Sequence, residues 1–134
     1  MLKLDHKPHE KSRSAKELAW VFANEEKVAF TGVFSGELKF EEIPAPATMK
    51  EALAIYEKAH KENVERVKKM PDAELNKMMK MHVGPKKTAD FRKIDILWMF
   101  LMDMIHHRGQ FSVYLRLVDA KVPSIYGPSA DEPW

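Results

Sequence analysis

A long apolar run near the carboxyl end, Ile94 to Val118, dominates the hydrophobic pattern of the chain. At about 100° per residue its apolar positions fall on one broad face, which predicts an amphipathic helix packed against a core. Asp103, His107 and Gln110 lie on that same face. Burying such polar groups is costly unless they are paired or bound to something, so the three residues form a candidate site. The apolar face consists of Ile96, Phe100, Met104, Phe111, Tyr114 and Val118.

Two further long helices are predicted ahead of this run. Ser14 to Glu17 and Thr48 to Glu51 both have the spacing of a capping box, in which a hydroxyl and a carboxylate satisfy backbone donors at a helix start. An apolar stripe follows each box. The pattern therefore predicts helices from Ala15 to about Phe34 and from Met49 to Met70.

The segment after Pro71 is predicted to contain a short helix and a turn. Asp72 is a plausible cap for a third helix that extends to about Met79, and a turn at Gly84 and Pro85 follows. The long helix is then expected to begin at about Thr88 or Asp90. We find no internal repeat and no convincing β-hairpin, so the predicted class is all-α, with residues 1–134 forming a single domain.

Composition narrows the functional classes. The net charge of +2 combines 22 basic with 20 acidic side chains that are interspersed along the chain, which argues against a nucleic-acid partner. Asp95 and Asp103 interrupt the longest apolar run, so no membrane span is expected. The amino-terminal residues lack the apolar core of a secretion signal, and cysteine is absent. A cytoplasmic location is the expectation.

Asp103 and His107 are the candidate chemistry. Their i,i+4 spacing stacks the two side chains one turn apart, where they can chelate one ion or hydrogen-bond to each other. A carboxylate and an imidazole suit Zn, Mn, Ni or Fe, whereas the alternative is a buried hydrogen-bonded pair without metal. Gln110 either orients His107 or bonds to the backbone. Glu25 is the one carboxylate at the border of the first helix's apolar stripe.

The surroundings of three other positions in the long helix can also be predicted. Gly109 lies in mid-helix at a cost near 1 kcal/mol relative to alanine, which favours close approach of another helix. His106 points about 100° away from His107 around the helix and is expected at the surface. Trp98 is expected in the core.

The sequence also resembles a known family. The runs His106 to Arg116 and Val122 to Ser129, together with Lys7 to Ser12 and Leu18 to Trp20, resemble the DinB-like (DinB/YfiT) family over nearly the whole chain. The resemblance implies a four-helix bundle, often dimeric, with three histidines on a divalent metal. Characterised relatives include thiol-dependent S-transferases and isomerases, so a low-molecular-weight thiol is an implied cofactor.

The resemblance also assigns the metal ligands. His107 matches the second histidine of the family's helical H-x-x-x-H pair, and Asp103 stands at the first. The third ligand position corresponds to Val21, which cannot bind a metal, and Glu25, one turn further along, is the obvious substitute. The family places a long helix before the Lys7 lead-in. We therefore expect this first helix to be missing and a homodimer to compensate for it.

Two functional hypotheses follow from these observations. The first is a divalent-metal-dependent enzyme of the thiol S-transferase or hydrolase type, acting on a small-molecule substrate through a partly degraded metal site. The second is a non-catalytic small-molecule-binding or assembly protein that kept the bundle and lost the metal chemistry. The valine at position 21 favours the second, whereas Asp103 and His107 favour the first.

Overall fold

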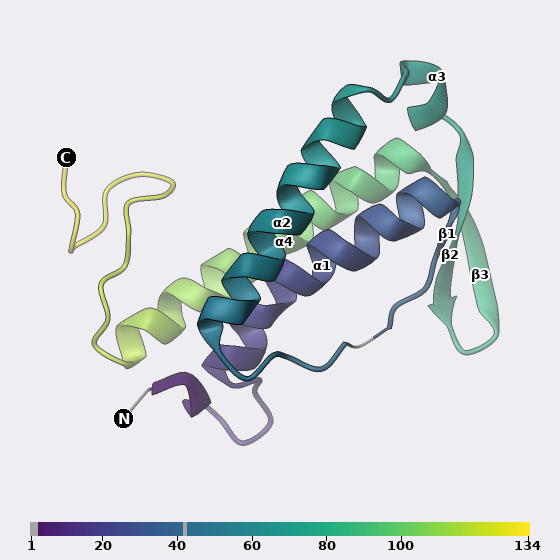
Figure 1. Ribbon diagram of the computed structural model, residues 1–134. Helices are drawn as coiled ribbons and strands as arrows, with labels where there is room; N and C mark the ends of the chain where they lie inside the picture. The colour runs from purple at the N-terminus through teal and green to yellow at the C-terminus, as the bar shows by residue number, and fades with distance from the viewer. Residues whose placement is uncertain (1–2, 42) are drawn as a thin grey trace.

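The computed structural model describes residues 3–41 and 43–134. Three long helices lie alongside one another, and a small sheet closes one end of the bundle (Figure 1). The long helices are α1 (Ala15–Ser35), α2 (Met49–Lys68) and α4 (Lys93–Leu117), and the short helical segments are η1 (Lys3–Asp5) and α3 (Asp72–Leu75).

Both predicted capping boxes are present. At the start of α1, the backbone N–H of Glu17 donates to the Ser14 hydroxyl at 3.2 Å, and the Glu17 carboxylate accepts from the Ser14 N–H at 2.6 Å. Thr48 and Glu51 form the same reciprocal pair at the start of α2. Gly36 ends α1 with a φ of 86°, a left-handed conformation that glycine adopts without strain. The predicted starts of α1 and α2 are confirmed.

A three-stranded sheet lies where the sequence predicts helix and turn, so the prediction of no β-hairpin is wrong. The predicted all-α class holds in part, because the fold is mostly helical. Strands β2 and β3 form an antiparallel hairpin, and β1 pairs with β2 in parallel. The third helix ends four residues after Pro71 instead of near Met79, and the long helix begins after the hairpin instead of at Thr88 or Asp90. The strands are β1 (Glu37–Leu38), β2 (Met78–Gly84) and β3 (Lys87–Arg92).

The sequence of the hairpin has only a weak local preference for strands and a turn. Met79 and Met81 are buried while Met78 is exposed, which is the alternation of a half-buried strand, but methionine has no strand preference. The turn between β2 and β3 contains Lys86 at a φ of 57°, where glycine or asparagine is usual. The hairpin therefore depends on packing against the helices more than on turn chemistry.

The main core lies between α1, the sheet and α4. Gly32 of α1 passes so close to β1 that an added Cβ would lie 2.7 Å from Leu38 Cδ1. A second, smaller cluster joins α1 to α2 around Trp20, whose indole N–H donates to the Ile43 carbonyl at 2.7 Å. The main core comprises Ala29, Val33, Leu38, Met79, Met81, Ile96 and Phe100.

A buried polar contact fixes α2 against α1. The Glu26 carboxylate, which is 5% exposed, accepts from Asn63 Nδ2 at 2.9 Å and lies 2.5 Å from His60 Nδ1. This pairing compensates the burial of the carboxylate. Glu26 therefore faces α2, and the neighbouring Glu25 is left to face α4.

The outer face of α4 is apolar and exposed. Trp98, expected in the core, is instead 55% exposed, because the hairpin and α1 cover the opposite side of the helix. Gly109 lies on this outer face, with nothing within 4 Å of an added Cβ, so none of the helices among the described residues packs against it. Other exposed side chains of the α4 face are Leu101, Met102, Ile105, Val113 and Leu117.

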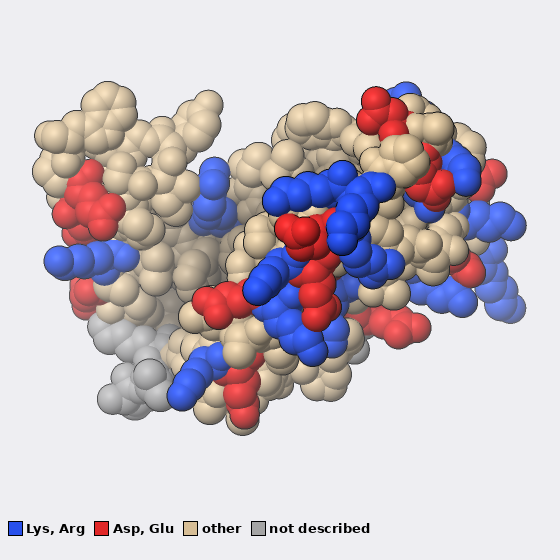
Figure 2. All heavy atoms as spheres, turned by 45° about the horizontal axis from the view of Figure 1, so that its top comes forward, with Lys and Arg blue, Asp and Glu red and all other residues tan. Residues whose placement is uncertain are grey.

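Charged side chains are mixed in sign over the face shown in Figure 2, where basic and acidic groups lie next to one another. None of the helices built from the described residues is long and apolar enough to cross a membrane.

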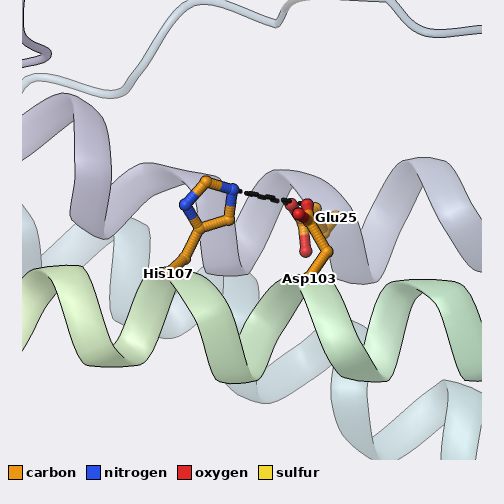
Figure 3. A group of neighbouring side chains, drawn as sticks. All are labelled: Glu25, Asp103 and His107. Atoms are coloured by element: carbon orange, nitrogen blue, oxygen red, sulfur yellow. Dashed lines mark ion pairs between the residues drawn. The ribbon is translucent and has the colours of Figure 1, made fainter.

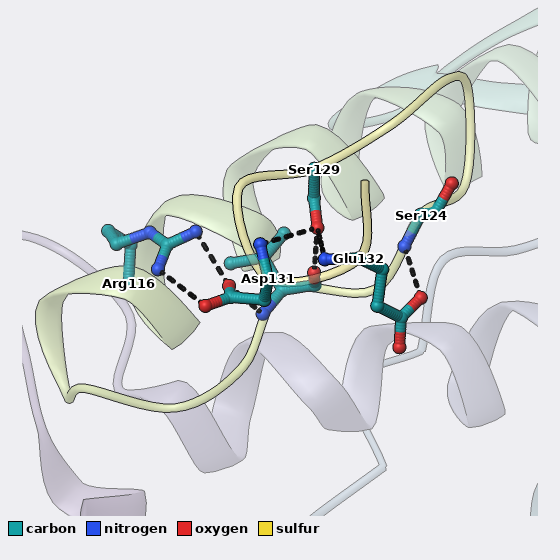
Figure 4. A network of polar contacts seen from close by, with 6 residues as sticks. Arg116, Ser124, Ser129, Asp131 and Glu132 are labelled. Carbon is teal, nitrogen blue, oxygen red and sulfur yellow. Dashed lines mark hydrogen bonds and ion pairs between the residues drawn. The ribbon is translucent and has the colours of Figure 1, made fainter. Parts of the chain in front are cut away.

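The residues after α4 form a tail that folds on itself (Figure 4). Arg116 of α4 donates to both carboxylate oxygens of Asp131 at 2.7 and 3.3 Å. The Ser129 hydroxyl donates to the Val122 carbonyl, and the Glu132 carboxylate accepts from the backbone N–H of Ser124 at 2.7 Å. These bonds order the tail without regular secondary structure.

Candidate metal centre

Glu25 of α1 and Asp103 and His107 of α4 meet between the two helices (Figure 3). Nε2 of His107 lies 3.3 Å from Asp103 Oδ2 and 3.7 Å from Glu25 Oε1. One ligand atom from each residue lies within 4.8 Å of the other two. One nitrogen and two oxygens are thus close enough to share an ion.

The two helices that carry these residues are held in register by aromatic contacts. Phe22 of α1 meets Phe111 of α4 edge-to-face, with ring centroids 6.4 Å apart. Phe22 precedes Glu25 and Phe111 follows His107 by about one turn, so this contact lies beside the triad. The positions of the ligands therefore depend on the packing of α1 against α4.

Gln110 sets the orientation of the His107 ring. Nδ1 of His107 lies 2.9 Å from Gln110 Oε1, an amide oxygen that only accepts. Nδ1 therefore carries the hydrogen, and in the neutral ring the Nε2 lone pair points toward the two carboxylates. Metal-binding histidines commonly have this arrangement, in which a neighbouring group fixes the tautomer.

The Glu25 carboxyl is strongly perturbed. Burial, followed by the hydrogen-bonding contact and negative charge of Asp103, raises the pKa of Glu25 from 4.5 to about 8. Its Oε2 is buried and has no hydrogen-bond partner among the described residues. The site therefore favours a proton or a cation beside Glu25.

A cavity of about 650 Å³ opens onto the triad. Val21, the position where the third histidine was expected, lies in its wall together with Trp20 and Phe100. Asp103 is 47% exposed, whereas His107 and Glu25 are nearly buried. The centre is thus closed on the α1 side and accessible from the cavity.

Comparison with known proteins assigns the chain to a family. The pattern of the DinB family matches residues 3–133. The chain belongs to the DinB family. The DinB fold is also present in solved structures: a DinB-like protein from Bacillus cereus has a TM-score of 0.75 at 23% identity, covering 92% of this chain and 81% of that one. A DinB-like protein from Bacillus subtilis has a TM-score of 0.67 at 18% identity, covering 90% of this chain and 80% of that one. No protein with a curated description matches the sequence.

In this DinB chain the triad of Glu25, Asp103 and His107 differs from the three histidines that the family resemblance implies. Asp103 and His107 lie together as their spacing predicts, and Gln110 contacts His107. Glu25 supplies the contact from α1 that Val21 cannot, because it lies one turn further along the same face. The only sequence signal for Glu25 was that one-turn spacing and its place at the border of an apolar stripe.

The residues present suit a divalent cation. Two carboxylate oxygens and an imidazole nitrogen are ligands for Zn, Mn, Ni and Fe. A cation would supply a partner for the buried Glu25 Oε2, which has no hydrogen bond among the described residues. It would also offset the repulsion between the Glu25 and Asp103 carboxylates. The ligand atoms and the electrostatics of the site therefore both favour a divalent cation.

Proposed function

We propose that this DinB-family protein binds one divalent metal ion through Glu25, Asp103 and His107 and acts as a metal-dependent enzyme of the S-transferase or hydrolase type. The observation that carries the proposal is the buried Glu25 carboxyl, whose pKa is raised to about 8 beside a second carboxylate and an oriented imidazole. Such perturbed groups in a cavity are typical of functional sites.

Each side chain has a separate part in the proposed site. Glu25, which is nearly buried, and Asp103, which is half-exposed, would hold the ion together with His107. Gln110 holds the His107 tautomer through Nδ1. Val21 and Phe100 form an apolar wall that limits access of water. A metal bound here would lower the pKa of a water or a small thiol and supply it as a nucleophile.

Calorimetric titration tests metal binding. Tag-free protein, first treated with chelator, is titrated with Zn, Ni and Mn. We expect a dissociation constant on the order of micromolar, because only three protein ligands are present, and a loss of at least about tenfold in His107→Ala. His106→Ala is the matched control, because His106 is an exposed neighbour outside the triad. Absence of binding, or equal losses in both variants, would contradict the proposal.

A second candidate function is non-catalytic assembly, and the outer face of α4 favours it. This face exposes a continuous row of apolar side chains around Gly109, where no Cβ blocks approach of another backbone. Groups of exposed apolar side chains of this kind often mark interaction surfaces. We propose that two copies pair through this face as a homodimer with two-fold symmetry.

A further inference from the structure

A second hollow, of about 490 Å³, lies on the Nδ1 side of His107, between the lead-in to α1 and the carboxyl-terminal half of α4. His107 and Arg13 border both this hollow and the cavity over the metal centre. The hollow is therefore next to the proposed metal site but is made of different side chains. Its other lining residues include Ser12, Leu18, Gln110, Val113 and Tyr114.

The two spaces differ in charge. Among the described residues, no aspartate or glutamate lines the hollow. The cavity over the metal centre has four such residues, Glu17, Glu25, Glu41 and Asp103. Carboxylates favour cations, whereas a surface that has a guanidinium and no acid favours anions. The two spaces are thus complementary to ligands of opposite charge.

Three hydrogen-bond donors in the hollow have no partner within the described chain. The oxygen of the Gln110 amide is occupied by His107, which leaves its NH₂ group free to donate. The Ser12 hydroxyl and the Arg13 guanidinium make no hydrogen bond or ion pair among the described residues. The charge of Arg13 nevertheless acts at longer range, where it favours the ionised forms of Glu17 and Glu25. The Tyr114 hydroxyl donates to the Arg13 carbonyl at 2.9 Å and so fixes the Arg13 backbone at the rim.

We propose that this hollow binds the carboxylate of a small organic acid. Arg13 pairs with the carboxylate, the Gln110 amide and the Ser12 hydroxyl donate to it, and the apolar part of the acid packs against Leu18 and Val113. Arginine suits this role because its planar guanidinium can donate two parallel hydrogen bonds to a carboxylate. The apolar walls favour an organic acid over an inorganic anion, and the hollow has the size of a small-molecule site.

Binding of the organic acid in this hollow does not require a metal ion. The donors of the hollow are separate from Glu25 and Asp103, so anion binding persists in the presence of chelator. Because His107 lies between the two spaces, an acid held by Arg13 would lie beside the proposed metal centre.

Benzoate is the probe, titrated by NMR into the full-length protein with chelator present. We expect a dissociation constant on the order of 1 mM, as for a ligand of this size. Arg13→Gln and Gln110→Glu should each weaken binding by at least about tenfold, the first by removing the guanidinium and the second by placing a carboxylate in the hollow. Lys11→Gln, an exposed cation of the lead-in that does not line the hollow, should leave the affinity unchanged.

Two further probes separate the possible outcomes. Benzyl alcohol, which keeps the ring and lacks the charge, should bind at least about tenfold more weakly than benzoate. If inorganic phosphate binds as tightly as benzoate and responds equally to Arg13→Gln, the site is a general anion site and the organic-acid assignment is overturned. No benzoate binding, or equal effects of Arg13→Gln and Lys11→Gln, also overturns it. Circular dichroism verifies that each variant is folded, and metal titration of the same protein reports separately on the triad.

Discussion

Nε2 of His107 lies 3.7 Å from Oε1 of Glu25, and this contact joins two helices that are distant in the sequence. Both side chains are nearly buried, at 12% and 11% exposure. The contact brings a third ligand to the local pair of Asp103 and His107. Through this one contact the pair of Asp103 and His107 becomes a candidate site with three possible ligands.

Glu25 should make stability fall as pH rises. Its pKa is raised from 4.5 to about 8 in the folded state, so the folded protein holds the proton more tightly than the unfolded chain does. The resulting stabilisation is fully present below about pH 4.5 and is lost as pH rises through about 8. Glu25→Gln cannot ionise, and at pH 8 to 9 it should be more stable than wild type by on the order of 2 kcal/mol.

Urea unfolding between pH 5 and pH 9, with chelator present, measures this effect. Glu62→Gln, at an exposed position of α2, is the control and should keep the wild-type pH profile. The same Glu25→Gln protein should bind metal at least about tenfold more weakly, since it lacks a ligand carboxylate. A wild-type pH profile in Glu25→Gln would contradict the assignment of the raised pKa.

Val21→His should strengthen metal binding. Val21 lines the cavity that opens onto the triad and lies one turn before Glu25 on the same helix. An imidazole there adds a nitrogen ligand, and we expect binding to tighten by at least about tenfold, or about 1.4 kcal/mol. Calorimetric titration compares it with Val21→Leu, which changes volume but adds no ligand. Equal affinities in the two variants would show that residue 21 does not reach the ion.

The apolar face of α4 should mediate self-association. A single substitution, Ile105→Glu, tests this, because it places a charge on the exposed apolar face. Sedimentation across a dilution series should show a wild-type dimer, with an interface on the order of 2,000 Å² or more, and a monomeric Ile105→Glu. Leu53→Glu is the matched control, because Leu53 is also an exposed apolar residue but lies on α2. A stably folded wild-type monomer at low micromolar concentration would rule out the dimer.

Gly32→Ala should destabilise the fold. The added Cβ would lie 2.7 Å from Leu38 Cδ1 and 3.0 Å from its Cα, so α1 and β1 would have to move apart. Overpacking of this kind costs on the order of 1–3 kcal/mol. Thermal unfolding should show a lower Tm for Gly32→Ala than for Gly84→Ala, where an added Cβ meets nothing within 4 Å. Equal melting temperatures would mean that the sheet end of the bundle is loosely packed.

Features that depend on residues close together in the chain agree with the sequence predictions. The capping boxes of α1 and α2 and the i,i+4 pair of Asp103 and His107 each involve residues three or four positions apart, and the structure places them as predicted. The hairpin was missed because its alternating methionines and its Lys86 turn have no strong local preference.

By itself the sequence determined the three long helices, the starting points of α1 and α2, and the local pair of possible ligands. These features depend on backbone hydrogen bonds and helical periodicity over a few residues. Only the tertiary structure decided which carboxylate of α1 joins Asp103 and His107. Glu25 does so, whereas the adjacent Glu26 accepts a hydrogen bond from Asn63 of α2. The physical reason is that the packing of α2 and α4 around α1 decides which neighbour each carboxylate meets. This packing depends on many contacts between residues that are far apart in the chain.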